Sequence, residues 1–336
     1  MEKSAQEVVL TVSSSPHVRC NESIPKIMWT VVATLVPAAA FGVYYFGFNA
    51  LLNIIVSIVS AVFFEWAWEK FMHKKITIND GSAVITGLLL AMCCSPILPW
   101  WMCIVGSFIA IVVCKQAMGG LGYNLFNPAH VGRAGLMVSW PVAMTTWTQV
   151  NGSVIDGVAG ATPLNVLKQS GYDALLQLFN NDPMTMYQNM FLGFRNGSMG
   201  ETSTVLLILG GLFLMYKGYV KWQATVAMIA TVGILMWVFG GAVGAHATGG
   251  LFTGDPIFHM MAGGLIIGAF FMSTDMVTAP ITLKGQLIFA VGAGVLTVLI
   301  RLLGGYPEGV CYSILLMNAV TPLIDLTVKP RIFGSV

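Results

Sequence analysis

Residues 27–64 read IMWTVVATLVPAAAFGVYYFGFNALLNIIVSIVSAVFF, a stretch that contains no Asp, Glu, Lys or Arg. A helix needs about 20 apolar residues to cross a bilayer, so this stretch has room for one or two such helices. Two further charge-free stretches cover residues 81–114 and 222–254. The chain as a whole is 56% hydrophobic and 9% charged, whereas soluble domains carry about 25% charged residues. The sequence therefore predicts an all-α polytopic membrane protein in contact with membrane lipid.

The apolar segments divide the chain into two membrane regions separated by a long loop. We expect a polar N-terminal tail at 1–26, which stays attached because no cleavage site follows a short apolar core, a loop at 147–203 and a C-terminal tail at 327–336. Several spans are short or contain Gly or Pro, so some should be broken or re-entrant helices. About ten spans are predicted, at 27–48, 50–68, 82–95, 97–114 and 128–146 in a first membrane repeat (27–146), and at 204–216, 223–241, 257–273, 286–303 and 309–326 in a second (204–326).

The lysines and arginines predict which side of the membrane each loop faces. With the N-terminus in the cytoplasm, thirteen of the 16 basic residues lie on the inner side, including Arg133 near the inner end of the fifth span. Only Lys168, Arg195 and Arg301 then lie outside. Cytoplasmic loops are enriched in Lys and Arg, and the opposite orientation would reverse this bias. We therefore expect both termini in the cytoplasm and residues 147–203 to be extracytoplasmic.

Five spans before the loop and five after it make the second half inverted relative to the first. The sequence repeats weakly in agreement, since G-L-L-L-A-M from Gly87 has a counterpart in G-L-I-I-G-A-F-F from Gly264, and the G-G turn at Gly119 has one at Gly304. Inverted repeats bind ligands between their halves, where the ends of broken helices offer unpaired backbone groups. This pattern alone predicts a transporter-like bundle, and a solute channel or carrier without a redox cofactor fits it.

Composition also bears on charged and metal-binding sites. The net charge is +2 and no basic run occurs, so no nucleic-acid partner is expected. The six cysteines form no C-x-x-C pair and no His stands at ligand spacing, so we expect no metal site. Near the span ends, Glu65, Arg301 and Asp325 are expected to snorkel toward water. We expect His246 and His259 to be packed or hydrogen-bonded rather than to act as ligands.

The long loop contains the motif D-G-V-A-G-A-T at residues 156–162, followed by P-L-N-V-L-K-Q-S-G. Thr162 before Pro163 is typical of a helix start, with Thr as the N-cap and Pro at the first helical position. Gly171 stands where the helix would stop. The motif by itself predicts a capped helix. The loop offers no nucleophile paired with a base and no paired carboxylates, so we expect no catalytic residue there.

A second motif, G-G-L-G-Y-N-L-F-N-P-A, leads into the fifth span. Gly119 and Gly120 permit close backbone approach to a flat ligand, and Asn124 and Asn127 supply amide donors and acceptors. A Gly-rich turn with Asn and Pro at a helix start is the alternative interpretation. The corresponding segment of the second half contains Ser273, Thr274, Asp275 and Thr278.

These motifs resemble a known family, the D subunit of the Rnf ion-pumping ferredoxin:NAD oxidoreductase and the related B subunit of the sodium-pumping NADH:quinone oxidoreductase. The resemblance runs along nearly the whole chain. It includes S-S-P-H at 14–17, the two motifs above, G-A-F-F-M-S-T-D-M-V-T at 268–278, and G-G-Y-P-E-G-V from Gly304 with the closing P-L-I-D-L-T-V-K-P-R-I-F-G. The chain length and the short N-terminal tail are more similar to those of the Rnf protein.

The resemblance implies that Thr162 carries FMN through a phosphodiester to its hydroxyl, attached by a flavin transferase. Gly160 and Ala161 would leave room for the transferase, and the helix beginning at Pro163 would direct its N–H groups and the positive end of its dipole at the phosphate. Asp156 would be a recognition residue for the transferase. A second, non-covalent flavin such as riboflavin, as in related subunits, would lie between the repeats near the glycines and asparagines of the second motif and Thr274 and Asp275.

The implied function is that of a membrane subunit of a redox-driven translocase in the inner membrane of a prokaryote. It would carry electrons by covalent FMN, coupled to Na⁺ or H⁺ movement, with no independent catalytic activity. Its partners would be the A, B, C, E and G types of Rnf subunit. The equivalent B-type component of the quinone-reducing complex is one alternative. The solute channel or carrier is an alternative from another class, and a scaffold without a cofactor is a third.

Overall fold

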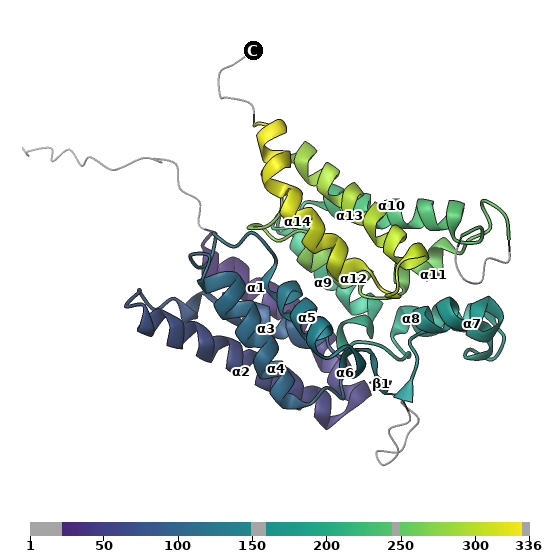
Figure 1. Cartoon of the computed structure of the whole chain (residues 1–336), viewed down its shortest axis with the longest axis horizontal. Helices are drawn as coiled ribbons and strands as arrows, with labels where there is room; N and C mark the ends of the chain where they lie inside the picture. The colour runs from purple at the N-terminus through teal and green to yellow at the C-terminus, as the bar shows by residue number, and fades with distance from the viewer. Residues whose placement is uncertain (1–21, 149–158, 244–248, 331–336) are drawn as a thin grey trace, which may run out of the picture.

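The computed structural model describes residues 22–148, 159–243 and 249–330 (Figure 1). The S-S-P-H motif, Asp156 and His246 lie outside these ranges. Within them, the regular secondary structure is helical apart from two short strands, and five helices are long and apolar enough to cross a membrane. The remaining apolar helices are shorter than a full span. The prediction of an all-α polytopic membrane protein is therefore confirmed.

The first half of the chain forms the purple and blue part of Figure 1. Ser23 caps its first helix, where its hydroxyl accepts a hydrogen bond from the Lys26 amide. The elements are α1 (Ile24–Phe46), α2 (Phe48–Phe71), η1 (Ile78–Asp80), α3 (Ser82–Met92), α4 (Trp100–Phe108), η2 (Ile109–Gln116, a π-helical segment that directly follows α4), α5 (Pro128–Ser139) and α6 (Pro141–Thr145).

The loop and the second half continue the chain in teal, green and yellow. The loop holds β1 (Trp147–Thr148), β2 (Ala159–Gly160), α7 (Pro163–Gln177), α8 (Pro183–Leu192) and η3 (Met199–Glu201). The two strands pair antiparallel, with Trp147 opposite Gly160, and this small sheet was not predicted. The second half holds α9 (Thr204–Tyr216), α10 (Trp222–Phe239), α11 (Pro256–Met261), α12 (Leu265–Ile267), η4 (Gly268–Met272, also π-helical), α13 (Leu283–Leu303) and α14 (Val310–Thr327).

Three predicted spans are short or broken, as the Gly and Pro content indicates. The third ends at Met92 after 11 residues, a rise of about 16 Å, which is half a bilayer. The fifth is interrupted between α5 and α6 at Trp140, directly before Pro141. The eighth is interrupted between α11 and α12, where Gly263 has a φ of +58° that favours glycine. Broken helices at membrane depth need other groups to satisfy the freed backbone.

The loop helix that begins at Pro163 stops at Gly171, as predicted. Gly171 leaves the helical conformation, with a φ of +86°, and a second helical stretch follows at once, so α7 (Pro163–Gln177) consists of two helices joined at a kink. A glycine with positive φ ends one set of helical hydrogen bonds without preventing a new one from starting. The second stretch, after Gly171, was not predicted.

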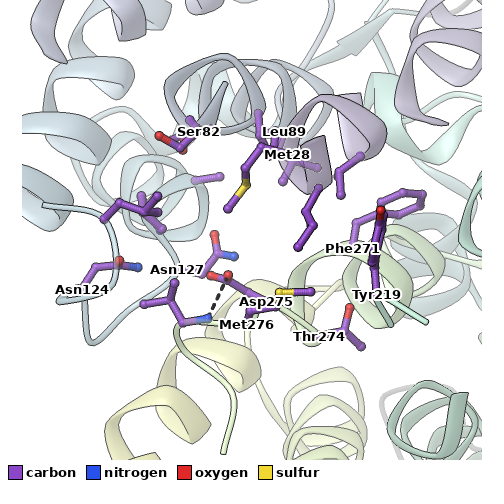
Figure 2. Close-up of a pocket in the computed structure, with 18 of the residues that line it drawn as sticks. Met28, Ser82, Leu89, Asn124, Asn127, Tyr219, Phe271, Thr274, Asp275 and Met276 are labelled. Atoms are coloured by element: carbon purple, nitrogen blue, oxygen red, sulfur yellow. Dashed lines mark hydrogen bonds between the residues drawn. The ribbon is translucent and has the colours of Figure 1, made fainter. Parts of the chain in front are cut away.

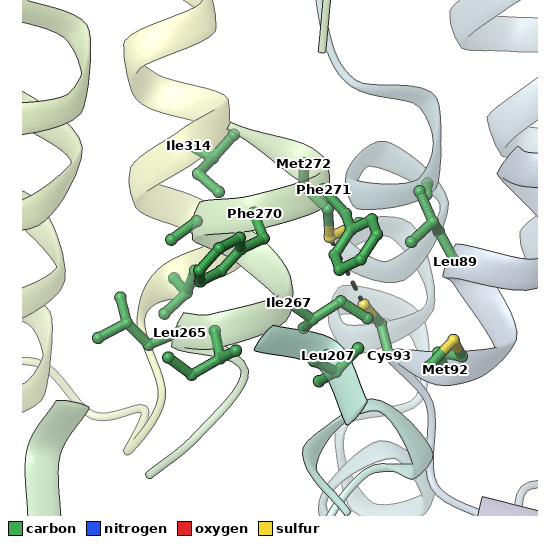
Figure 3. Packing of buried hydrophobic residues seen from close by; sticks show 14 of the residues in the cluster. Leu89, Met92, Cys93, Leu207, Leu265, Ile267, Phe270, Phe271, Met272 and Ile314 are labelled. Atoms are coloured by element: carbon green, nitrogen blue, oxygen red, sulfur yellow. Dashed lines mark hydrogen bonds between the residues drawn. The ribbon is translucent and has the colours of Figure 1, made fainter. Parts of the chain in front are cut away.

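The two halves use matching helix pairs and lie side by side (Figure 1). In the first half α2 packs against α4, and in the second α10 packs against α13. Across the junction, α1 meets α9 and α5 meets α14. At the centre, the end of α3 meets η4, where the Cys93 thiol lies 3.9 Å from the Met272 sulfur, beside Phe271 (Figure 3). The short third and broken eighth spans thus meet in the core.

Two of the three ionisable residues near span ends do not snorkel. Glu65 is buried and forms an ion pair of 2.6 Å with Lys115, which is itself 1% exposed. Arg301 is buried and donates to the carbonyls of His259 and Ala262 at 2.6 and 2.8 Å. Unpaired charges are costly in the membrane interior, so both residues gain partners from distant parts of the chain. Asp325, by contrast, is partly exposed and accepts a hydrogen bond from the Ile281 amide at 3.1 Å.

Gly87 sets the distance between α2 and α3. A Cβ atom at this position would lie 2.6 Å from the Ser57 carbonyl oxygen, which is backbone and cannot rotate away. We expect Gly87→Val to lower stability by about 1–3 kcal/mol through overpacking, measured as a lower thermal unfolding midpoint in detergent. The matched control is Gly250→Val, because a Cβ atom there meets nothing within 4 Å. Equal midpoints for the two variants would contradict this account of the packing.

Candidate functional site

Thr162 is the N-cap of α7, as predicted from the Thr-Pro pair. Its backbone is extended, and its hydroxyl oxygen accepts a hydrogen bond of 3.2 Å from the Asn165 amide. The side chain is 2% exposed. Gly160, two residues earlier, belongs to the short strand β2, and Ala161 follows it. The hydroxyl therefore lies at the positive end of a helix dipole, a position that favours a bound phosphate group.

Lys168 fastens α7 to the membrane helices. Its ammonium group donates to the Gly304 carbonyl and, at 3.2 Å, to the Tyr306 carbonyl, just after the end of α13. Leu164 belongs to a buried apolar cluster that also includes Phe258 of α11. Sequence reasoning used Lys168 only as a charge outside the membrane. Its role depends on carbonyl groups more than 130 positions away, which no local signal indicates.

A cavity of about 320 Å³, which we call the loop cavity, lies between α5, α6, α7 and the segment before α14. Asn165 and Gln169 of α7 line it, three and seven residues after Thr162. The opposite walls include residues of α5, of the segment before α14 and of α14 itself: Arg133, Met137, Tyr306, Glu308 and Tyr312. The sequence analysis did not identify this cavity.

Arg133 is the buried charge of the loop cavity. One guanidinium nitrogen pairs with the Glu308 carboxylate, while the Arg133 Nε atom is buried without a hydrogen-bond partner. The sequence placed Arg133 near the inner end of the fifth span, and in the structure it is held inside the protein by an acid of the other half. The physical reason is that a buried cation needs a partner, and Glu308 supplies one across the junction.

A second cavity, of about 110 Å³, lies between the two halves, and we call it the repeat cavity (Figure 2). It brings together four of the predicted residues, namely Asn124, Asn127, Thr274 and Asp275. Ser82 and Lys115 also line it, although sequence reasoning missed both. A lysine inside an apolar helix, with an acid in a neighbouring predicted helix, was the available signal.

The predicted glycines Gly119 and Gly120 do not line the repeat cavity. Both have positive φ angles, +128° and +104°, and form the turn between η2 and α5. A side chain at Gly119 would press against the ring of Tyr123, because a Cβ atom would lie 3.1 Å from it. These two glycines therefore serve the turn that presents Asn124, which is the alternative interpretation of the motif.

Some polar groups of the repeat cavity have hydrogen-bond partners within the protein, and one does not. The Asn127 side chain caps α5 by accepting from the His130 amide at 3.3 Å. Asn124 donates to the Phe126 carbonyl at 3.1 Å, but its own carbonyl oxygen is buried without a partner. Buried acceptors normally find a donor, so this oxygen is suited to a ligand that carries an N–H or O–H group.

Charged groups line the same cavity from both halves. Asp275, which follows η4, accepts from the Val277 amide at 3.3 Å and from the Thr278 hydroxyl at 3.2 Å. Burial raises the pKa of its carboxyl group. On the other side, Lys115 donates to Glu65 and to the Ser82 hydroxyl, each at 2.6 Å. The cavity thus offers an amide, a carboxyl and hydroxyl groups to a polar ligand.

The two cavities share helix α5. Asn127 at its start lines the repeat cavity, and Arg133, six residues later, lines the loop cavity. At about 1.5 Å per residue, these positions are separated by about 9 Å along the helix. Among the described residues, no group of three or more His, Cys, Asp or Glu side chains could hold a metal ion. The two cavities therefore lie at successive positions along α5, and each offers polar groups to an organic ligand.

Comparison with known proteins agrees with this organisation. The model of the NQR2, RnfD, RnfE family matches residues 11–334. The D subunit of the proton-translocating ferredoxin:NAD(+) oxidoreductase complex of Clostridium ljungdahlii is 63% identical over 97% of both chains. The D subunit of the Na(+)-translocating ferredoxin:NAD(+) oxidoreductase complex of Acetobacterium woodii is 43% identical over 98% of this chain and 96% of its own length.

A third relative, from Stutzerimonas stutzeri, is named as the D subunit of an ion-translocating oxidoreductase complex. It is 38% identical over 94% of this chain and 93% of its own length. The match of the family model covers both membrane halves and the loop between them. From this match and the identity of full-length relatives, the chain belongs to the NQR2, RnfD, RnfE family.

Proposed function

We propose that this chain is the D subunit of an ion-translocating ferredoxin:NAD oxidoreductase complex, in which it carries electrons on flavin. The observation that carries the proposal is Thr162, the N-cap of a helix that lies beside a cavity, within the D-G-V-A-G-A-T motif. The names of the full-length relatives support it. The chain acts as part of a redox-driven translocase and has no catalytic activity of its own.

Thr162 would hold FMN as a phosphodiester. The helix N-terminus that follows it favours the negative phosphate, and the residues before it are small, which leaves room for a flavin transferase. Asp156 would take part in recognition by that enzyme. When bound, the flavin supplies one- and two-electron chemistry, while the protein fixes its position and surroundings.

The repeat cavity would hold a second, non-covalent flavin such as riboflavin. The support is chemical, because the carbonyl oxygen of Asn124 is buried without a donor and hydroxyl and carboxyl groups lie around it. At about 110 Å³ the cavity is smaller than the usual ligand pocket, so binding of a flavin would require the two halves to move apart. Because α5 borders both cavities, electrons would pass between two sites at successive positions along one helix. Residues Asn124, Asn127, Thr274 and Asp275 would position this flavin.

Electron transfer would be coupled to movement of Na⁺ or H⁺, since relatives named for each ion match this chain over nearly its whole length. The partners would be the A, B, C, E and G types of Rnf subunit. Both termini would lie in the cytoplasm, with residues 147–203 outside the inner membrane, as the distribution of basic residues indicates.

Covalent flavin is tested by in-gel fluorescence. The protein is expressed with a flavin transferase, denatured in SDS and compared with Thr162→Ala. We expect fluorescence that survives SDS in the unaltered chain and is lost completely in the variant, because no other hydroxyl heads the motif. Thr185→Ala, in the same loop, is the control and should stay fluorescent. A dark unaltered band, from cells that flavinylate another target, would favour the solute carrier.

The second flavin is tested by acid extraction of the folded protein. Asn124→Leu removes the unpartnered acceptor, and the loss of about 1–3 kcal/mol should weaken retention of the non-covalent flavin about tenfold. The SDS-resistant band should not change. Exposed Asn79 provides the control Asn79→Leu, which should retain both flavins. Equal retention in the two variants would argue against this location.

The orientation is tested by thiol labelling in a Cys20→Ser background, since the five described cysteines are buried. Met184→Cys lies in the loop and Lys217→Cys after α9, and both positions are exposed. An impermeant thiol reagent should label the first in intact spheroplasts and the second only after permeabilisation. The reverse pattern would invert the proposed topology.

A further inference from the structure

Two residues of α7 that follow Thr162 line the loop cavity. Asn165 and Gln169 follow Thr162 by three and seven positions on α7, so the three residues share one face of the helix. The Asn165 amide is bonded to the Thr162 hydroxyl oxygen. A group tethered to that oxygen therefore starts at the edge of the cavity, on the face that α7 turns toward it.

The walls of the loop cavity are suited to a flat aromatic ring. The rings of Tyr306 and Tyr312 lie 5.5 Å apart between centroids and are tilted by 28° from parallel, and both side chains line the cavity. Trp147, which is buried, and Met137 add apolar surface. Aromatic side chains favour offset or edge contacts with a further ring. A cavity of about 320 Å³ is also within the usual size range of ligand pockets.

The polar side of the loop cavity offers one unused donor. Arg133 is buried and paired with Glu308, yet its Nε–H has no acceptor. Leaving such a donor unpaired costs about 1–3 kcal/mol, so a ligand that brings an acceptor is stabilised there. The carbonyl oxygens of an isoalloxazine ring are acceptors of this kind, and they stand at one end of an otherwise apolar ring.

We propose that the loop cavity seats the isoalloxazine ring of the flavin attached to Thr162, with Arg133 as the donor to a ring carbonyl and Tyr306 and Tyr312 as the aromatic wall. This inference rests on the proposed attachment of FMN to Thr162. Lys168 acts as a positioning residue, because its bonds to the Gly304 and Tyr306 carbonyls hold α7 over the aromatic wall.

Binding of the ring next to Arg133 would affect the midpoint potential of the covalent flavin. The Arg133 cation stabilises negative charge that the ring gains on reduction, so Arg133→Gln should make the midpoint potential of the covalent flavin more negative. The single variant also leaves Glu308 as an uncompensated buried carboxylate. The double variant Arg133→Gln with Glu308→Gln restores neutrality, and its potential should lie between those of the single variant and the unaltered chain.

The direct test compares native and denatured fluorescence of the full-length flavinylated protein. Stacked tyrosines quench flavin emission, so native fluorescence per covalent flavin should be low and should rise several-fold in Tyr312→Leu. The SDS-denatured band should be equally bright in both. Tyr44→Leu is the control, because Tyr44 is 81% exposed and lies on α1. Iodide should quench the native flavin poorly before any substitution and efficiently after Tyr312→Leu.

The possible outcomes separate the two proposals. Absence of an SDS-resistant band in the unaltered chain removes the attachment to Thr162 itself. The unaltered chain could instead show a bright SDS band together with strong native emission and full quenching by iodide. That result would contradict binding of the ring in the loop cavity, while the attachment to Thr162 would still hold. The iodide result needs no variant, so misfolding of Tyr312→Leu would not prevent the decision.

Discussion

The ion pair between Arg133 and Glu308 joins the two halves of the membrane domain at the wall of the loop cavity. Arg133 belongs to α5, and Glu308 directly precedes α14, the last helix of the other half. Two buried charges are costly unless each satisfies the other, so this contact constrains the distance between the halves. Because α5 borders the repeat cavity at its start and the loop cavity further along, its position shapes both cavities.

The broken eighth span depends on a second buried arginine. Irregular backbone at membrane depth is tolerated only where its polar groups find partners. Arg301 of α13 meets this requirement, since it donates to the His259 and Ala262 carbonyls and to the Glu308 carbonyl at 3.0 Å. The same residue therefore stabilises the break between α11 and α12 and the loop that carries Glu308. Arg301 thus holds both the broken helix and the segment before α14.

Local signals in the sequence predicted the fold class and several residues of the two candidate sites. The scarcity of charges predicted the membrane class, the Thr-Pro pair predicted the cap at Thr162, and the Asn residues before α5 predicted two walls of the repeat cavity. The pair Arg133–Glu308 could not be predicted, because it joins residues of the two halves that are far apart in the chain. For the same reason the loop cavity was missed. Gly119 and Gly120 were placed in the wrong role because a turn and a ligand contact require the same backbone freedom.

The central claim is that this protein carries one flavin covalently, on Thr162 at the edge of the loop cavity. Mass spectrometry of the purified, denatured protein, followed by sequencing of its peptides, tests it most directly. The account predicts an intact mass raised by that of FMN less one water, with the added mass on the peptide that contains Thr162. An unmodified mass, in protein from cells that flavinylate another target, or an added mass on a different residue, would contradict it.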